Sequence, residues 1–154
     1  MRKTWSAWLA AAALLAGCEP GGSRVPLVEY IPVPGNPQLP FSDAVRVGHL
    51  LFLSGQLGTD STGRLAGGGI AAETRQALEN IRRVLEWQGS SLQQVVKCTA
   101  MLADIKEWSA MNEVYVTYFR SHLPARSAFG TTGLAMGARI ELECWATVPD
   151  GPAR

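Results

Sequence analysis

One arginine and two glutamates carry the side-chain chemistry that stands out in the second half of the chain. Arg126 follows Pro124 and Ala125 at the start of a predicted strand, and its guanidinium is a planar fork of donors that can grip a carboxylate through two parallel hydrogen bonds. Glu141 and Glu143 lie two residues apart on another predicted strand, so they share one face at a separation of roughly 7 Å. A positioned carboxyl group can move protons during hydrolysis, whereas an isolated charge is more often solvated or paired with another charge. The spacing of the two glutamates does not predict a catalytic dyad.

The cysteines beyond the N-terminal segment do not indicate a metal site. Cys98 and Cys144 are far apart in the sequence, and no pair of closely spaced cysteines is combined with histidines at ligand spacing. The two can remain as thiols buried in the core or, in an exported protein, can oxidise to a disulfide. Of these alternatives the sequence favours two buried thiols, and we expect no metal.

The first seventeen residues have the architecture of a secretory signal. A basic start at Arg2 and Lys3 precedes about twelve apolar residues, fewer than the ~20 of a transmembrane helix, and small residues stand directly before Cys18. The sequence LAGC at 15–18 resembles the lipobox of bacterial lipoproteins, in which the cysteine is acylated. We therefore expect residues 1–17 to be a lipoprotein signal peptide and residues 18–27 to be a lipidated N-terminus with a flexible tether. The expected location is outside the cytoplasm, anchored to a membrane and facing the periplasm. The alternatives are an ordinary cleaved signal and an apolar helix that packs on the domain.

The remainder, residues 28–150, has the size of one ordinary domain. The whole chain has 154 residues, of which 47% are hydrophobic and 18% charged, and its formal net charge is +1. Because it contains no basic run or stripe, we do not expect nucleic acid as a partner. These properties predict a single globular domain behind the tether.

Hydrophobic periodicity predicts an α+β domain. Alternating or continuous apolar residues predict strands, and apolar residues that recur at three and four predict amphipathic helices. In chain order we expect strands at 43–47, 49–56, 95–102, 125–130 and 139–148, a helix at 70–87 that Gly89 ends, and a second helix around 108–119. The strands at 49–56 and 95–102 are apolar enough to be buried on both faces. This order indicates a mixed sheet with both helices on one face.

Two helices cover only one face of such a sheet, and the other face is partly apolar. In the last strand Trp145 shares the uncovered face with Glu141 and Glu143, and the apolar run at 50–53 also presents side chains there. A sheet with an uncovered apolar face usually meets another subunit, so we expect an oligomer. The alternative is a monomer whose open sheet face is partly polar.

Five short segments resemble, in order and spacing, the RidA family of reactive intermediate deaminases, which is also called the YjgF family. They are LSGQ at 53–56, ETRQALEN at 73–80, MNEVY at 111–115, PARS at 124–127 and IELE at 140–143. Each segment is weak alone, but together they cover the domain from about residue 40 to 148. The resemblance implies a chorismate-mutase-like α+β fold and a homotrimer whose sheets line a central β-barrel, with active sites between subunits.

The resemblance also implies an activity and a set of site residues. RidA proteins hydrolyse small 2-imino and 2-enamino acids to 2-oxo acids and ammonia without a cofactor, which makes this chain a candidate 2-iminobutanoate/2-iminopropanoate deaminase. Carried over to this sequence, Arg126 becomes the carboxylate clamp and Glu141 the residue that positions water. Five further positions are carried over as substrate-binding residues: Ser54, Gly55, Phe41, Asn112 and Ala128.

Two of these positions depart from the family pattern. Phe41 stands where many members have a tyrosine, which removes a hydroxyl near the substrate, and Ala128 replaces a frequent cysteine. The arginine and the glutamate are both kept, so deaminase chemistry remains the leading hypothesis. The alternative is a non-catalytic trimer that binds small carboxylates or acts as a chaperone. A nuclease, an activity sometimes attributed to this family, is disfavoured because the sequence has no basic groove. The implied partners are a small 2-imino or 2-oxo acid, further copies of the chain, and a membrane through the lipid.

Overall fold

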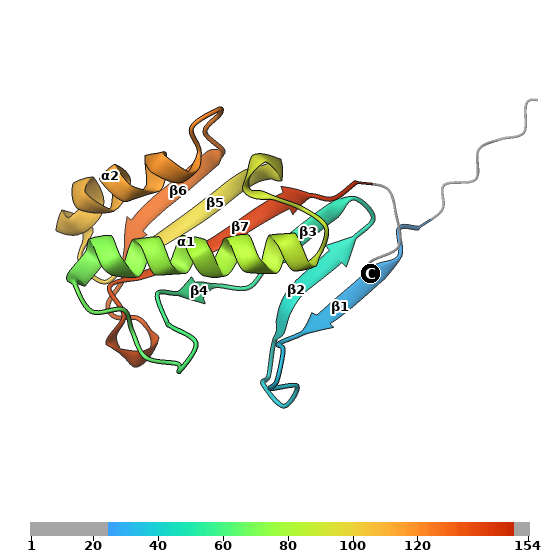
Figure 1. Cartoon of the computed structure of the whole chain (residues 1–154), viewed down its shortest axis with the longest axis horizontal. Helices are drawn as coiled ribbons and strands as arrows, with labels where there is room; N and C mark the ends of the chain where they lie inside the picture. The colour runs from blue at the N-terminus through green and yellow to red at the C-terminus, as the bar shows by residue number, and fades with distance from the viewer. Residues whose placement is uncertain (1–24, 150–154) are drawn as a thin grey trace, which may run out of the picture.

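The computed structural model describes residues 25–149, so the predicted signal peptide and the predicted lipidation site Cys18 lie outside the described residues. The elements follow one another as β1 (Val28–Pro32), β2 (Ser42–Val47), β3 (Leu50–Leu53), β4 (Gln56–Leu57), α1 (Gly69–Trp87), β5 (Val95–Leu102), α2 (Trp108–Tyr118), β6 (Ala125–Gly130) and β7 (Ile140–Thr147) (Figure 1). Single 3₁₀ turns lie at 92–94, 105–107 and 135–137. The predicted order of strands and helices is confirmed, and β1 is an additional strand. Within this part of the chain, no helix is long and apolar enough to cross a membrane.

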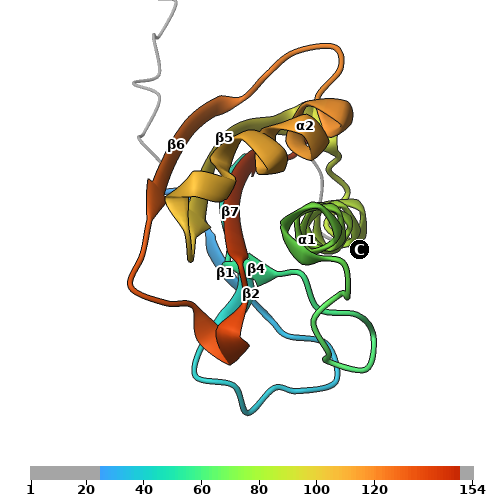
Figure 2. The same ribbon diagram turned by 90° about the vertical axis from the view of Figure 1, so that its left-hand side faces the viewer.

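The strands form one seven-stranded sheet in the order β1-β2-β3-β7-β5-β6, and the short β4 pairs with β7. Neighbouring strands are antiparallel except for the parallel pair β5–β6. A parallel pair needs a crossover connection, and α2 provides it between the end of β5 and the start of β6. Both helices lie on one face of the sheet, and no helix of the described chain covers the other face (Figure 2). The predicted α+β fold, with two helices on one face of a mixed sheet, is confirmed.

The hydrophobic core lies between the helices and the covered face of the sheet. Leu78, Ile81 and Leu85 recur at three and four along α1, and all three are fully buried. They belong to the same core cluster as Leu51 of β3, which is also fully buried. Burial of each such side chain stabilises the fold by about 1.5–3 kcal/mol. The helix ends as predicted at Gly89, whose φ of 73° lies in the left-handed region that a Cβ atom disfavours.

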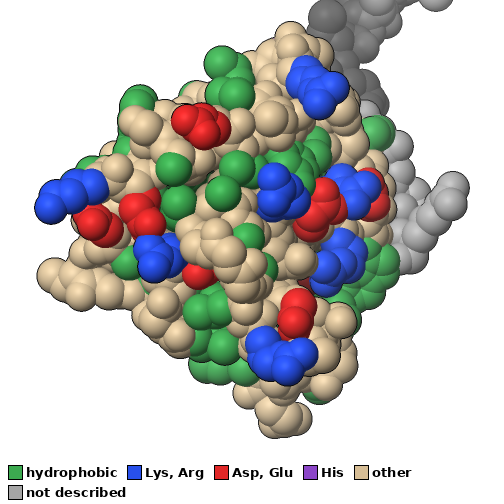
Figure 3. Space-filling model, turned by 60° about the vertical axis from the view of Figure 1, so that its left-hand side comes forward, with side chains coloured by type: hydrophobic (Ala, Val, Ile, Leu, Met, Phe, Trp, Pro, Cys, Tyr) green, Lys and Arg blue, Asp and Glu red, His purple; other side chains and the backbone are tan. Residues whose placement is uncertain are grey.

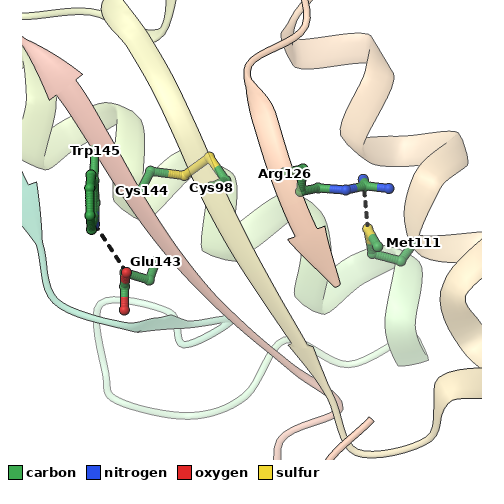
Figure 4. The surroundings of a disulfide bond; sticks show 6 residues. All are labelled: Cys98, Met111, Arg126, Glu143, Cys144 and Trp145. Carbon is green, nitrogen blue, oxygen red and sulfur yellow. Dashed lines mark hydrogen bonds between the residues drawn. A yellow bond between two sulfur atoms is a disulfide. The ribbon is translucent and has the colours of Figure 1, made fainter. Parts of the chain in front are cut away.

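Cys98 of β5 and Cys144 of β7 are joined by a disulfide (Figure 4). The two residues are directly opposite each other in the antiparallel register, their Cα atoms are 4.1 Å apart, and both are fully buried. Directly opposed residues are the closest pairs that antiparallel strands offer, so a disulfide can form between them. The expectation of two buried thiols is therefore wrong. The cysteines are 46 residues apart, and composition and spacing do not reveal the strand register that brings them together.

The uncovered face of the sheet is partly apolar. Along β7, accessible residues alternate with buried ones, and Glu141, Glu143 and Trp145 lie on the uncovered side, as predicted. The ring of Phe52 from β3 packs edge-on against Trp145, with centroids 4.9 Å apart. Strands β3 and β5 also bury mainly alternate residues, so one chain does not provide the expected burial of both faces. The oligomer that would cover this face stays a prediction.

Candidate active site

The seven predicted catalytic and substrate-binding residues fall into two groups. The arginine group lies on β6 and the neighbouring helix α2 and consists of Arg126, Ala128 and Asn112. The glutamate group lies where β4 meets β7 and where β2 begins, and it consists of Phe41, Ser54, Gly55 and Glu141. Each group contains one of the two residues to which the sequence assigns chemistry.

Arg126 lies under α2, on the helix-covered face of the sheet. Its guanidinium carbon is 4.7 Å from the ring centroid of Tyr115 and 5.7 Å from that of Trp108. Its Nη1 atom faces the sulfur of Met111 at 3.9 Å (Figure 4). Cation–π contacts of this kind contribute about 0.5–2 kcal/mol each, and a thioether is only a weak acceptor. The helix therefore holds and orients the guanidinium while using only one of its donors, on the weak acceptor of Met111.

The positive charge of Arg126 has no counter-charge among residues 25–149, and no oxygen of these residues accepts a hydrogen bond from it. Tyr115 does not supply a negative charge, because burial raises the pKa of its phenol to about 12 although the nearby arginine acts in the opposite direction. The Tyr115 hydroxyl is itself buried and has no hydrogen-bond partner in this part of the chain. A partly buried cation with unused donors is costly, so the arginine group is suited to bind an anion.

The other two members of the arginine group carry polar atoms on the same two elements, α2 and β6. The Oδ1 atom of Asn112 is buried and has no hydrogen-bond partner within the described residues. Ala128 pairs with Ala100 of β5 and packs against the core, on the same strand as Arg126. Because β6 is at the edge of the sheet, its outer side presents backbone donors and acceptors that no strand of the described chain pairs.

The carboxylate of Glu141 lies directly against Gly55. A Cβ atom built on Gly55 would be 1.9 Å from Oε1 and 2.8 Å from Cδ of Glu141, so only glycine leaves room for the carboxylate in this position. The pairing of β4 with β7, which aligns Leu57 with Glu141, brings the two segments together. Neither oxygen of Glu141 accepts a hydrogen bond from residues 25–149. The carboxylate is therefore held in position by the backbone, and its oxygens remain available to a bound molecule.

Ser54 and Phe41 shape the glutamate group rather than add charge to it. The Ser54 hydroxyl donates to the carbonyl of Ser42 at 2.6 Å, and the Ser54 backbone N–H donates to the carbonyl of Asp43 at 2.9 Å. These bonds tie the end of β3 to β2 and fix the backbone that leads into Gly55. Phe41, directly before β2, is 54% exposed and presents an apolar ring without a hydroxyl.

Arg126 and Glu141 of one chain cannot grip the same small molecule. Arg126 is on the helix-covered face, and Glu141 is on the uncovered face. On β5 the residues opposite them are Cys98 and Met101, so they are offset by about 10 Å along the strands. Strand β5 lies between β6 and β7, which adds roughly 10 Å across the sheet. A site that contains both residues must combine two chains.

Three residues that contact Arg126 are not among the site residues predicted from the sequence. Trp108, Met111 and Tyr115 are at i, i+3 and i+7, so they share one face of α2, and the sequence places them on an amphipathic helix with its apolar side toward the core. The only signal in the sequence is that this face is rich in aromatic and sulfur-containing side chains. Their role depends on α2 crossing over β6.

The chain is similar to known proteins over most of its described length. A model of the protein family described as endoribonuclease L-PSP matches residues 34–148, which include both groups of site residues. The human protein named 2-iminobutanoate/2-iminopropanoate deaminase is 44% identical over 108 residues, 70% of this chain and 79% of the human protein. The crystal structure of the YjgF gene product from E. coli has a TM-score of 0.68 at 27% identity and covers 77% of this chain and 92% of its own. The structure of E. coli TdcF with bound serine also has a TM-score of 0.68, at 26% identity, with 72% and 90% covered.

Proposed function

Because the chain belongs to the endoribonuclease L-PSP family, also known as the RidA/YjgF family, we propose that it hydrolyses small 2-imino and 2-enamino acids. In this reaction water adds to the carbon of the C=N bond, the nitrogen leaves as ammonia, and the carbon becomes the ketone of a 2-oxo acid. Mammalian relatives at 43–45% identity are named for this activity on 2-iminobutanoate and 2-iminopropanoate, which supports the same reaction here. Water addition and proton transfer need only positioned acid–base groups, so the proposal includes no cofactor.

The unpaired guanidinium of Arg126 is the observation that carries this proposal. Its charge is held between the Tyr115 and Trp108 rings, and no described residue offers it an oxygen acceptor. The carboxylate of a 2-imino acid would neutralise this charge and accept two parallel charge-assisted hydrogen bonds from the guanidinium. Such bonds contribute about 1.5–3 kcal/mol each, and their geometry fixes the direction of the reacting carbon next to the carboxylate.

Glu141 is proposed to position the attacking water and to transfer protons. Its carboxylate lies against Gly55 and accepts no hydrogen bond from residues 25–149, so it can accept one from a water molecule. As the water oxygen adds to the imine carbon, Glu141 takes a proton from the water and then delivers it to the nitrogen. The hydroxyl proton of the adduct then passes to the departing nitrogen as the C–N bond breaks and the C=O bond forms, so one water is consumed for each ammonia released.

The proposal places the complete site between subunits of a homotrimer. Two observations support this arrangement: Arg126 and Glu141 lie on opposite faces of one sheet, and the uncovered face carries apolar residues such as Phe52 and Trp145. The arginine group of one subunit would meet the glutamate group of its neighbour. Light scattering of the purified protein tests this assembly, and a monomeric mass would remove the shared site.

We also propose that the protein is exported and anchored through lipid on Cys18. The support is the signal-like sequence of residues 1–17, which lies outside the described residues. Because imines hydrolyse readily in water, an anchored deaminase needs a nearby source, such as an enzyme that oxidises amines or amino acids at the same membrane. Metabolic labelling with a fatty acid, compared between wild type and Cys18→Ser, tests the anchor.

A ribonuclease reading is less well supported, although the family description contains the word. On the face shown in Figure 3, Lys and Arg side chains are interspersed with Asp and Glu and form no continuous basic strip. The formal net charge is only +1, whereas binding to a phosphate backbone relies on several clustered cations.

The decisive experiment supplies 2-iminopropanoate in situ from an amino-acid oxidase and follows the loss of imine. Wild type should accelerate this loss, Arg126→Ala should remove most of the acceleration, and Arg126→Lys should retain part of it because the charge stays while the planar fork is lost. Arg120→Ala is the matched control, since Arg120 is exposed and, within the described part of the chain, donates only to the carbonyl of Thr117. If wild type is no faster than Arg126→Ala, the deaminase proposal is wrong. Retained binding of a 2-oxo acid would then favour the non-catalytic carboxylate-binding alternative.

A further inference from the structure

A cavity of about 450 Å³ lies between the second half of α1, β4 and the segment that joins β1 to β2. None of the seven predicted site residues lines it. We call it the α1 cavity, and the residues that define it here are Asp43, Gln56, Asn80, Arg83, Val84 and Trp87. Its volume is in the range of small-molecule sites, and its lining combines charged side chains of both signs with an apolar wall. Asp60 also lines the cavity, but its carboxylate already accepts hydrogen bonds from Thr62 and Arg64 and is paired with the Arg64 side chain, so Asp43 and Arg83 are the charges left for an occupant.

Asp43 forms the negatively charged floor of the α1 cavity. Only 7% of the residue is exposed, and its Oδ1 atom accepts a single hydrogen bond, from Nε2 of Gln56 at 3.3 Å. The other carboxylate oxygen receives none from residues 25–149, and the side chain is in no ion pair with them. Burial raises the pKa of Asp43 above its ordinary value, against the weaker effects of Gln56 and Arg83. A single amide donor compensates poorly for the loss of water around a buried carboxylate, and a positively charged group of a bound ligand would compensate for it better.

Arg83 provides a positive charge at the exposed mouth of the same cavity. Its Nη2 atom donates to Oδ1 of Asn80 at 2.7 Å, and Asn80 is in turn held by bonds from its Nδ2 to two backbone carbonyls at 2.9 and 3.0 Å. The guanidinium is thus anchored at one nitrogen, and its other donors have no partner in this part of the chain. Arg83 and Asp43 attract each other but do not form an ion pair. The cavity therefore presents a separated negative and positive charge to one occupant.

These features point to a ligand that carries both charges. Val84 of α1 is 8% exposed and Trp87 is 51% exposed, and both line the same cavity as the two charged groups. A metal ion does not fit, because a guanidinium faces the same space and the described residues contain no group of three His, Cys, Asp or Glu side chains able to hold one. A simple anion would leave Asp43 unpaired, and a simple amine would leave Arg83 unpaired.

We propose that the α1 cavity binds a free α-amino acid with an apolar side chain. The ammonium group bonds to Asp43, the carboxylate bonds to Arg83, and the side chain packs against Val84 and Trp87. This site is separate from the residues proposed for imine hydrolysis, and the inference does not depend on that activity.

The test is isothermal titration calorimetry of the purified full-length protein with L-leucine. Wild type should bind it, and Asp43→Asn and Arg83→Gln should each weaken binding about tenfold or more, because each removes one charge-assisted contact. Asp43→Asn keeps an oxygen for the Gln56 bond, and Arg83→Gln changes an exposed side chain, so a thermal melt should show both variants folded. Arg82→Gln is the matched control: this neighbouring arginine pairs with Glu79 and does not line the cavity.

Two analogues test the need for both charges. 3-Methylbutylamine lacks the carboxylate and 4-methyl-2-oxopentanoate lacks the ammonium group, so each should bind at least about tenfold more weakly than leucine. The proposal is overturned if wild type gives no binding heat with leucine, or if either analogue binds as tightly. It is also overturned if Arg126→Ala abolishes leucine binding while Asp43→Asn leaves it intact, since leucine would then occupy the arginine group.

Discussion

Replacing Gly55 with alanine isolates the placement of Glu141 from the stability of the fold. The added Cβ would be 1.9 Å from Oε1 of Glu141, and an ordinary contact begins near 3.4 Å, so the carboxylate must move by about 1.5 Å. The atoms in the way are the far end of a flexible side chain, with Cδ at 2.8 Å and Cγ at 3.0 Å, rather than backbone. The side chain can swing aside without unfolding the protein. We therefore expect the melting temperature to change little while the carboxylate leaves its working position.

The expected effect on catalysis is large, because a misplacement of about 1 Å can reduce a rate by about 100-fold. We expect kcat for 2-iminopropanoate to fall by about that factor in Gly55→Ala, with KM nearly unchanged because Arg126 still holds the substrate carboxylate. The assay is the oxidase-coupled measurement of imine loss across a range of substrate supply, together with a thermal melt of the same sample.

Gly67→Ala is the matched control, because a Cβ atom at Gly67 meets no atom within 4 Å and the residue has no left-handed φ. If Gly55→Ala keeps kcat within about threefold of wild type while Gly67→Ala does the same, the contact between Gly55 and Glu141 does not matter for the reaction. The role of Glu141 in positioning water would then be wrong. A loss of both folding and activity in Gly55→Ala would instead contradict the view that the carboxylate can move freely.

Three further outcomes are expected. Replacing both Cys98 and Cys144 with alanine should lower the free energy of unfolding by up to about 4 kcal/mol, measured by urea denaturation, because the bond closes a segment of 46 residues; an unchanged midpoint would mean that the bond does not constrain the unfolded chain. The pKa of Tyr115 is raised to about 12, so the unfolded chain ionises it near pH 10 while the folded chain does not, and wild type should lose up to about 1.4 kcal/mol of stability per pH unit between these values. Tyr115→Phe should remove this component from the pH dependence, and identical slopes for both proteins would contradict the assignment. Trp145→Lys should place a charge on the uncovered face of the sheet and shift the light-scattering mass from that of the proposed trimer toward that of a monomer, whereas an unchanged mass would place the subunit contact elsewhere.

The elements of this fold were predictable where burial follows a regular spacing. The helix α1 presents one apolar side at three and four, and β7 alternates residue by residue, so their position and their facing follow from local sequence. Strand β1 is not predicted in this way, because prolines at 26 and 34 flank it and a proline at 32 is its last residue, and prolines argue against a strand. An edge strand tolerates them, since part of its backbone does not need a partner.

The sequence offers candidate site residues one by one but not their arrangement in space. The family motifs identify Arg126 and Glu141 as candidates, and within residues 25–149 the structure shows that Arg126 has no counter-charge and that the Glu141 carboxylate accepts no hydrogen bond. Their separation on opposite faces depends on the strand order β7-β5-β6 and on α2 crossing above Arg126. These contacts join segments that are far apart in the sequence, and neither composition nor periodicity predicts them.

The Cys98–Cys144 bond also acts as a check on how the strands are aligned. A slip of one residue between β5 and β7 would turn one cysteine to the opposite face of the sheet, so the bond can close only when the register is correct. Arg126 pairs with Cys98 across β5 and β6, and Glu141 lies three residues before Cys144 on β7. Both halves of the proposed site are therefore in fixed alignment with the same covalent bond. In an oxidising compartment, closing that bond would fix the alignment of the proposed catalytic residues before any substrate binds.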